Sequence, residues 1–180
     1  MIPLHGEVRI SVVEMQRDVR STWVGTPPPV DFHREKGILT FKMGNAFVAI
    51  ALMQEPIPWR DIERQCKEAW LWPNAEDALK RHTQHFALTL ESDSPPRDRA
   101  AKLTKVCAAV LAHCNASLGV LFGEAGVLAR KDVFRDMAVE SLRTSLPVEL
   151  WVDCKVGPCG QGMAQGFTKG LTSLGHPEIE

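Results

Sequence analysis

The chain has 180 residues, of which 44% are hydrophobic and 24% charged, and its net charge is −1. This length fits one domain, and the apolar share is ample for one packed core. A nucleic-acid-binding protein usually carries a basic excess, whereas here 21 Lys and Arg balance 22 Asp and Glu. No apolar stretch approaches the roughly 20 residues of a membrane-spanning helix, and the N-terminus lacks a signal-peptide pattern. We therefore expect one soluble domain over residues 1–180, with neither nucleic acid nor membrane as a partner.

The five cysteines indicate a reducing compartment. Their number is odd and no pair has the C-x-x-C spacing, which argues against a disulfide framework and against a zinc ribbon. Cys66, Cys107 and Cys114 are among them, and the last two lie on an apolar helical stripe that predicts buried, inert thiols. Cys154 and Cys159 flank a Gly-Pro turn and are interpreted as free thiols, with a redox or metal role as the alternative. We expect a cytoplasmic protein.

The first third of the chain predicts three strands and one helix. Residues 7–13 alternate between apolar and polar types and predict a strand, and a short helix follows over 15–23. Three successive prolines make 26–30 a rigid, extended loop. The ranges 37–43 and 45–53 predict a hairpin around a Gly-Asn turn. The second strand of this hairpin is apolar on both faces, so we expect it at the centre of a sheet.

A helix is predicted to begin near Pro58, where a missing N–H costs nothing. The residues of its predicted buried face are Ile62, Cys66, Ala69 and Trp70. Asn74 is placed to cap a second short helix over 75–82, and 86–90 is the next predicted strand.

The rest of the chain predicts a helix over 97–115, a strand over 118–122, a helix over 131–145 and a strand over 148–156. A Gly-rich loop and one more strand follow. The first six elements have the order of a ferredoxin-like β-α-β-β-α-β unit, extended by α-β-α-β. The expected fold is therefore an α+β domain built on a mixed β-sheet.

Several distinctive pieces give the chain a resemblance to a bacterial family known only as domain of unknown function 4261. The resemblance covers most of the chain in order. Its pieces are Met53–Trp59, Trp72-Pro73, the His82-x-x-His85 pair, Leu118–Phe122, Leu146–Trp151 and Thr168–Glu180. The resemblance implies a shared fold and brings no activity with it.

His82 and His85 are the candidate metal ligands, because H-x-x-H on a helix places both imidazoles on one face. A metal site needs a third ligand, and the sequence offers none beside them. The alternative is that His82 caps a helix end while His85 packs at the entry of a strand with one nitrogen hydrogen-bonded. We expect no tightly bound metal and no cofactor.

Three tryptophans and several prolines gather between residues 56 and 73, where they form either a partner-binding surface or a core cluster. Trp70 is predicted to be core because of its place on the helical stripe. The residues predicted to contact a partner are Pro28, Pro56, Pro58, Trp59 and Trp72. The Gly-rich segment 157–170 lacks the Gly-Lys-Ser/Thr of a phosphate-binding loop and is interpreted as a flexible surface hairpin. Its loop over 157–166 is a further candidate contact, because loops carry function more often than the scaffold does.

No pattern in the sequence demands catalysis. The function that the sequence favours is therefore a non-enzymatic protein-binding domain. By analogy with compact domains of this size, its partner is a bacterial toxin that it neutralises as an immunity protein. The alternative is a small metal- or ligand-dependent enzyme that uses His82, His85 and the Trp59–Trp72 loop.

Overall fold

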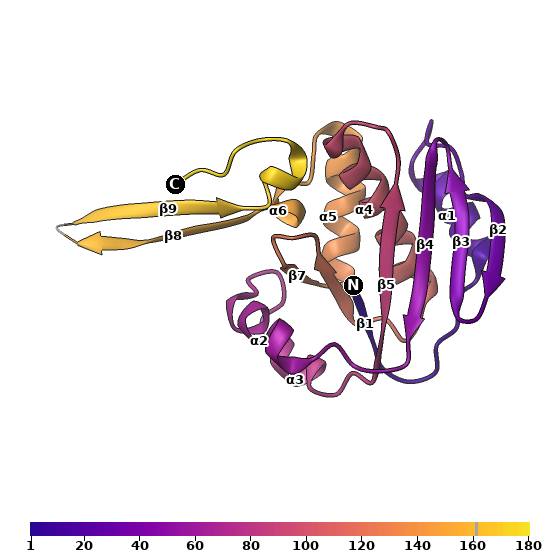
Figure 1. Cartoon of the computed structure of the whole chain (residues 1–180), viewed down its shortest axis with the longest axis horizontal. Helices are drawn as coiled ribbons and strands as arrows, with labels where there is room; N and C mark the ends of the chain where they lie inside the picture. The colour runs from indigo at the N-terminus through magenta and orange to yellow at the C-terminus, as the bar shows by residue number, and fades with distance from the viewer. Residues whose placement is uncertain (161) are drawn as a thin grey trace.

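An antiparallel sheet of five strands, in the order β1-β5-β4-β3-β2, is the centre of the computed structural model, which describes residues 1–160 and 162–180 (Figure 1). Its strands are β1 (Ile2–Leu4), β2 (Val30–Glu35), β3 (Ile38–Met43), β4 (Ala46–Met53) and β5 (Gln84–Glu91). The predicted hairpin is confirmed as β3 and β4, whose residues pair from Ile38 with Ala51 to Met43 with Ala46. The apolar β4 lies at the middle of the sheet, as its sequence predicts.

A second hairpin extends this sheet beyond β1. The amide of Leu118 donates to the carbonyl of Pro3 at 3.0 Å, and the amide of Leu121 donates to that of Met1 at 2.9 Å. The chain from Leu118 to β6 therefore runs beside the free edge of β1. The remaining strands are β6 (Gly119–Phe122), β7 (Val127–Arg130), β8 (Asp153–Gly160) and β9 (Met163–Lys169).

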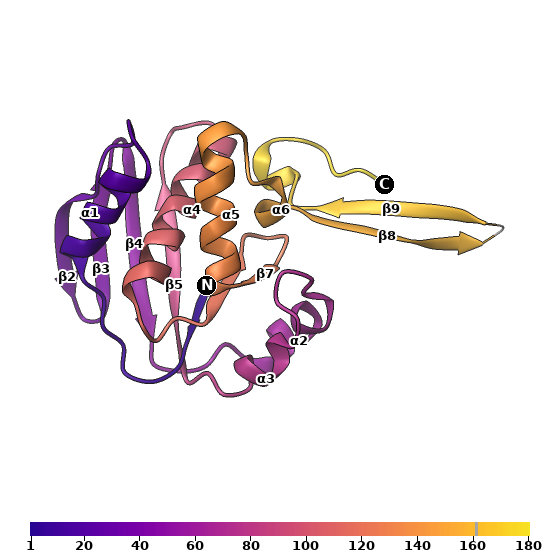
Figure 2. The same ribbon diagram turned by 180° about the vertical axis from the view of Figure 1, so that it is seen from behind.

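Three helices cover one face of the sheet (Figure 2). The helical segments are α1 (Val12–Thr22), α2 (Trp59–Glu68), α3 (Ala75–Leu79), α4 (Pro96–His113), α5 (Lys131–Thr144), α6 (Val148–Trp151) and the 3-10 turn η1 (Thr172–Leu174). Helices α1, α4 and α5 form the layer, and α2 and α3 lie at the end of the sheet near β7. Along β4, Val48 is fully buried toward the helices while its neighbour Phe47 is half exposed on the other face. No helix within the described residues that is long and apolar enough to cross a membrane was found.

The core has two clusters. The main one joins the inner face of the sheet, represented by Phe41 and Ile50, to Leu111 of α4 and Phe134 of α5. The second lies under α2 and α3, and its buried members are Ile57, Ile62, Cys66, Trp72, Ala75, Leu79, Leu121 and Leu128. Each fully buried large aliphatic or aromatic side chain contributes about 1.5–3 kcal/mol, so these two clusters supply most of the stabilisation.

The α+β class is confirmed, but the order of the elements differs from a ferredoxin-like start. The strand expected over 7–13 is wrong. The strand lies at Ile2–Leu4, and Ser11 begins α1 by accepting a hydrogen bond from the amide of Glu14. An unexpected strand, β2, precedes the hairpin, so β2 to β5 follow one another as an antiparallel meander. The ladders described in this sheet are antiparallel, and the expected mixed sheet is not found.

The C-terminal third also differs from expectation. The single strand predicted over 148–156 is divided, because Val148–Trp151 forms one helical turn and β8 begins only at Asp153. The Gly-rich segment does form the predicted hairpin, which is made of β8 and β9. This hairpin, which we call the arm, projects away from the sheet and its helices (Figures 1 and 2).

Candidate functional site

His82 and His85 form hydrogen bonds with backbone groups and do not form an open metal-coordination site. The Nε2 atom of His82 accepts from the amide of Ile57 at 2.8 Å, and its Nδ1–H donates to the carbonyl of Leu79. The Nδ1–H of His85 donates to the carbonyl of Glu55 at 2.9 Å. Both nitrogens of His82 are therefore occupied, which removes one of the two ligands proposed for a metal. The interpretation of His82 as a helix cap and of His85 as a packed residue at a strand entry is confirmed.

Burial favours the neutral form of His85. Desolvation lowers the pKa of His85, and the hydrogen bond to the Glu55 carbonyl offsets only part of that effect. The neutral ring suits a residue that donates one backbone hydrogen bond from inside the fold. Among residues 1–160 and 162–180, no group of three His, Cys, Asp or Glu side chains is placed to hold a metal ion.

The two histidines position the loop that begins α2. This loop exposes Pro56 and Pro58 and buries Ile57 between them. Trp59 follows at the first turn of α2 and is half buried, with the ammonium of Lys80 5.3 Å from the centroid of its ring. Since Lys80 covers one face of the indole, Trp59 offers a partner less surface than its sequence context implies.

The other two predicted contact residues do not join this loop. Trp72 is 6% exposed and belongs to the second core cluster, so its prediction as a contact residue is wrong. Pro28 is half buried and lies between α1 and β2, at the far end of the sheet from α2. The five predicted residues therefore do not form one surface.

Trp70 is the exposed tryptophan of this region. It was expected in the core because it continues the helical stripe of Ile62 and Cys66, but its exposed fraction is 62%. Helix α2 ends at Glu68, and Ala69 already has an extended backbone with ψ of 94°. The stripe stops with the helix, and Trp70 turns toward solvent.

Trp70 lines a cleft between the end of α2, the β6–β7 turn and the base of the arm, which we call the Trp70 cleft. The residues around it are Arg64, Gln65, Glu68, Ala69, Trp70, Ala125, Gly126, Val127, Leu128, Asp153 and Lys169. The lining of the cleft thus combines the indole of Trp70 with positively and negatively charged side chains. This combination suits recognition of another protein, because Trp and Arg are enriched among the residues that dominate interfaces.

A charged group closes the cleft toward the arm. The ammonium of Lys155 pairs with the carboxylate of Glu68 and lies 3.3 Å from that of Asp153. Burial raises the pKa of Asp153 and lowers the pKa of Lys155, and the cations of Arg64 and Lys169 act on both groups. The charges at this end of the cleft are therefore partly shielded from water, where they discriminate between partners more strongly than on an open surface.

The arm continues the cleft away from the body. Asp153 pairs with Lys169 and Lys155 pairs with Phe167, and residues two apart on a strand share a face. Phe167, which is 44% exposed, therefore lies on the same face of the arm as the residues that line the cleft. The opposite face carries Val156, which is 80% exposed.

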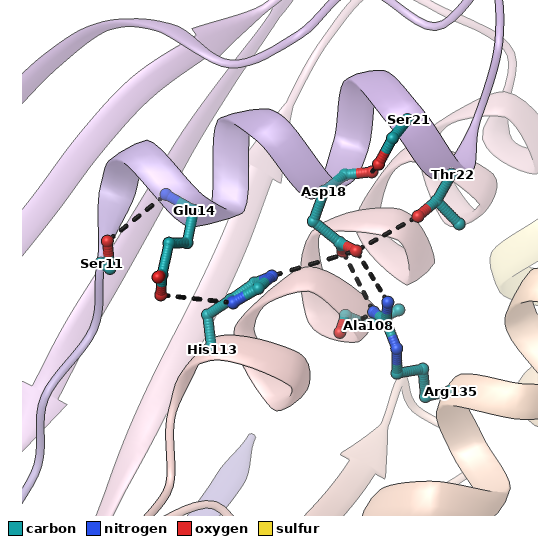
Figure 3. Close-up of polar contacts among 8 residues, drawn as sticks. All are labelled: Ser11, Glu14, Asp18, Ser21, Thr22, Ala108, His113 and Arg135. Carbon is teal, nitrogen blue, oxygen red and sulfur yellow. Dashed lines mark hydrogen bonds and ion pairs between the residues drawn. The ribbon is translucent and has the colours of Figure 1, made fainter.

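A polar network elsewhere on the molecule is structural (Figure 3). The guanidinium of Arg135 on α5 donates to the carboxylate of Asp18 on α1 at 2.7 and 3.1 Å and to the carbonyl of Ala108 on α4 at 2.9 Å. His113 lies beside this pair, but its Nε2 atom is 3.9 Å from Asp18, beyond hydrogen-bond distance. The hydroxyl of Ser21 donates to the backbone of its own helix. These side chains therefore tie three helices together without forming a catalytic triad.

Sequence reasoning missed one part of the surface that the structure brings together, because it placed Trp70 in the core. It did predict a surface hairpin over the Gly-rich segment that forms much of the arm. The available signal was the extended backbone demanded just before Pro73, since a residue that precedes proline rarely stays helical. Comparison of this chain with protein-family models, with curated proteins and with solved structures found no match.

Proposed function

We propose that this chain is a non-enzymatic protein-binding domain that acts by stoichiometric association, with the Trp70 cleft and the adjoining face of the arm as its contact surface. The observation that carries the proposal is the 62% exposed Trp70 at a charged cleft, whose arm residues share a strand face with Phe167. An exposed tryptophan is costly to leave in water and supplies a large, rigid contact area when it is covered.

The arm supports the same proposal. An isolated two-stranded ribbon is only marginally stable in water, and its edges present unpaired backbone groups. Val156 and Met163 add exposed apolar side chains along it. A partner that packs on the arm or pairs with its edge stabilises both features, which is a common mode of peptide and protein recognition.

The class of partner that we propose is a bacterial toxin, neutralised by one-to-one binding. This part of the proposal rests on analogy with compact immunity proteins, and the resemblance to domain of unknown function 4261 attaches no activity to the chain. We also propose a cytoplasmic location, because the five cysteines are free thiols in the structure.

The experiment compares Trp70→Ala with Trp59→Ala in binding to a partner captured from the native host and then purified. Loss of an interface anchor costs about 2 kcal/mol or more, so Trp70→Ala is expected to weaken binding about 30-fold through faster dissociation. Trp59→Ala is the matched control and is expected to weaken binding less, since Lys80 already covers its ring.

The arm is tested by Phe167→Asp, which places a charge on the proposed contact face, against Val24→Asp on the loop after α1, where Val24 is exposed. A charge on the arm should weaken the complex, and a charge on the distant loop should not. The proposal is refuted if the mass of the complex does not correspond to a fixed stoichiometry. It is also refuted if Trp70→Ala binds the partner as tightly as wild type does. Protection of cells that express the captured toxin, lost in Trp70→Ala, tests the immunity role.

A further inference from the structure

A second concave site lies on the helix-covered side of the sheet, away from the Trp70 cleft. The chain between β1 and α1 crosses the ends of β5, β4 and β3 (Figure 2), and a pocket of about 350 Å³ remains beneath it. Such a volume is at the lower end of the range for small-molecule sites. We call it the Arg34 pocket.

The floor of the Arg34 pocket is apolar and continuous. Leu39 pairs with Ile50 across β3 and β4, and Leu52 pairs with Phe86 across β4 and β5. Ile50 and Leu52 are two residues apart on one strand, so all four side chains share a face. Val8 and Ile10 of the crossing segment supply the opposite wall. The interior therefore favours a hydrocarbon body.

The rim carries the guanidinium groups of Arg9 and Arg34, and that of Arg9 is already paired with a carboxylate. Both Nε and Nη2 of Arg9 donate to the carboxylate of Glu7, at 2.9 and 2.7 Å. Arg34 donates only to the carbonyl of Ile10, at the long distance of 3.5 Å, and among the described residues it has no acidic partner. Its remaining N–H donors form a positive edge on an apolar pocket.

The charge of this rim selects the ligand. Glu35, the neighbour of Arg34 on β2, lies 3.7 Å from the ammonium of Lys36, and adjacent strand residues point to opposite faces, so Glu35 does not pair with Arg34. The guanidinium fork matches a carboxylate, and the side chains below it match an aliphatic or aromatic body. We propose that the Arg34 pocket binds a small carboxylate with an apolar body, of the class of medium-chain fatty acids.

The experiment titrates decanoate and decanol, below their aggregation limits, into isotopically labelled protein and follows the backbone amide signals. Decanoate is expected to bind one to one and to shift the amides of Leu39, Ile50 and Leu52. Because a hydrogen bond to a charged group is lost, Arg34→Gln should weaken decanoate by about tenfold or more. The same change should leave the affinity for decanol, which carries no charge, within a factor of about two.

Two further variants keep the test specific. Leu52→Gln places an amide in the floor and should weaken both ligands, while Arg143→Gln, an exposed change on α5, should affect neither. The melting temperature of each variant shows whether it remains folded. The proposal is overturned if decanoate does not saturate, if Arg34→Gln binds it as tightly as wild type does, or if Leu52→Gln has no effect.

Discussion

Replacement of Arg135 by alanine tests how the three-helix layer is held together. The side chains of Arg135 and Asp18 are 27% and 11% exposed, so the pair is largely removed from water. Without the guanidinium, the carboxylate of Asp18 keeps one described hydrogen bond, from the hydroxyl of Thr22 at 3.2 Å, while the Nε2 atom of His113 remains 3.9 Å away. The carbonyl of Ala108 also loses its side-chain donor.

The structure sets the magnitude of this effect. Removing one partner of a fully buried ion pair costs about 3–5 kcal/mol, because a buried charge is left uncompensated. The partial exposure of Arg135 lets water reach the site, so we expect a loss of about 3 kcal/mol in the free energy of unfolding. For a chain of this size, that corresponds to a fall of about 6–12 °C in melting temperature.

Urea denaturation of wild type, Arg135→Ala, Asp18→Ala and the double variant measures the loss and the coupling between the two residues. The double variant should cost less than the sum of the single variants by about 1–3 kcal/mol. Arg17→Ala, an exposed change on α1 with no ion pair among the described residues, is the control and should stay within about 0.5 kcal/mol of wild type. An Arg135→Ala protein as stable as this control, or strictly additive single variants, would refute the reasoning.

Three other predictions follow from burial and hydrogen bonding. In thermal melts, the melting temperature of Trp70→Ala should lie within about 1 °C of that of wild type. Trp72→Ala should lose about 3–5 kcal/mol in the free energy of unfolding, and equal losses of stability in the two variants would contradict their different burial. In native protein, a thiol reagent should modify only the exposed Cys154 and Cys159. Burial raises the pKa of the Cys66 thiol to about 11 and that of the Cys107 thiol to about 12. Labelling of all five cysteines before unfolding would be inconsistent with this prediction. Desolvation raises the pKa of Glu178, but backbone amides and hydroxyls outweigh it and hold the pKa at about 2. Its stabilisation is therefore complete above about pH 4.5 and is lost as the pH falls toward 2, so a Gln substitution there should flatten this part of the stability curve, and parallel curves would exclude the effect.

Long, strongly patterned elements were predictable from sequence because one residue pattern determined them. The hairpin of β3 and β4 has apolar strands around a Gly-Asn turn, and α4 has a stripe long enough to define its face. In contrast, β2 is mostly polar because it is an edge strand, and it carries an Asp31 with φ of 56° and a shift in register. Propensity cannot detect such a strand, because it is formed by pairing with β3.

The failure at residues 7–13 has a different cause. Val8 and Ile10 alternate with charged residues and do pack against the core, as the pattern implies. However, they form no ladder, because Pro3 and its neighbours already occupy the position between β5 and β6. The alternating pattern therefore predicted correctly that one side of this segment is buried, but it predicted wrongly that the segment pairs with a neighbouring strand.

The candidate surface could not be predicted because it depends on where one helix stops. Trp70 and Trp72 are two residues apart, yet one is exposed and the other is buried, because the chain leaves α2 as an extended segment whose Leu71 forms a bridge with Ala129 of β7. The buried ring requires Gly119, since a Cβ at that position would lie 2.4 Å from a carbon of the Trp72 ring. A core contact therefore positions the residue that is proposed to touch a partner. Any substitution that shifts Trp72 is then expected to change both the stability of the fold and recognition through Trp70, even though Trp72 itself is buried.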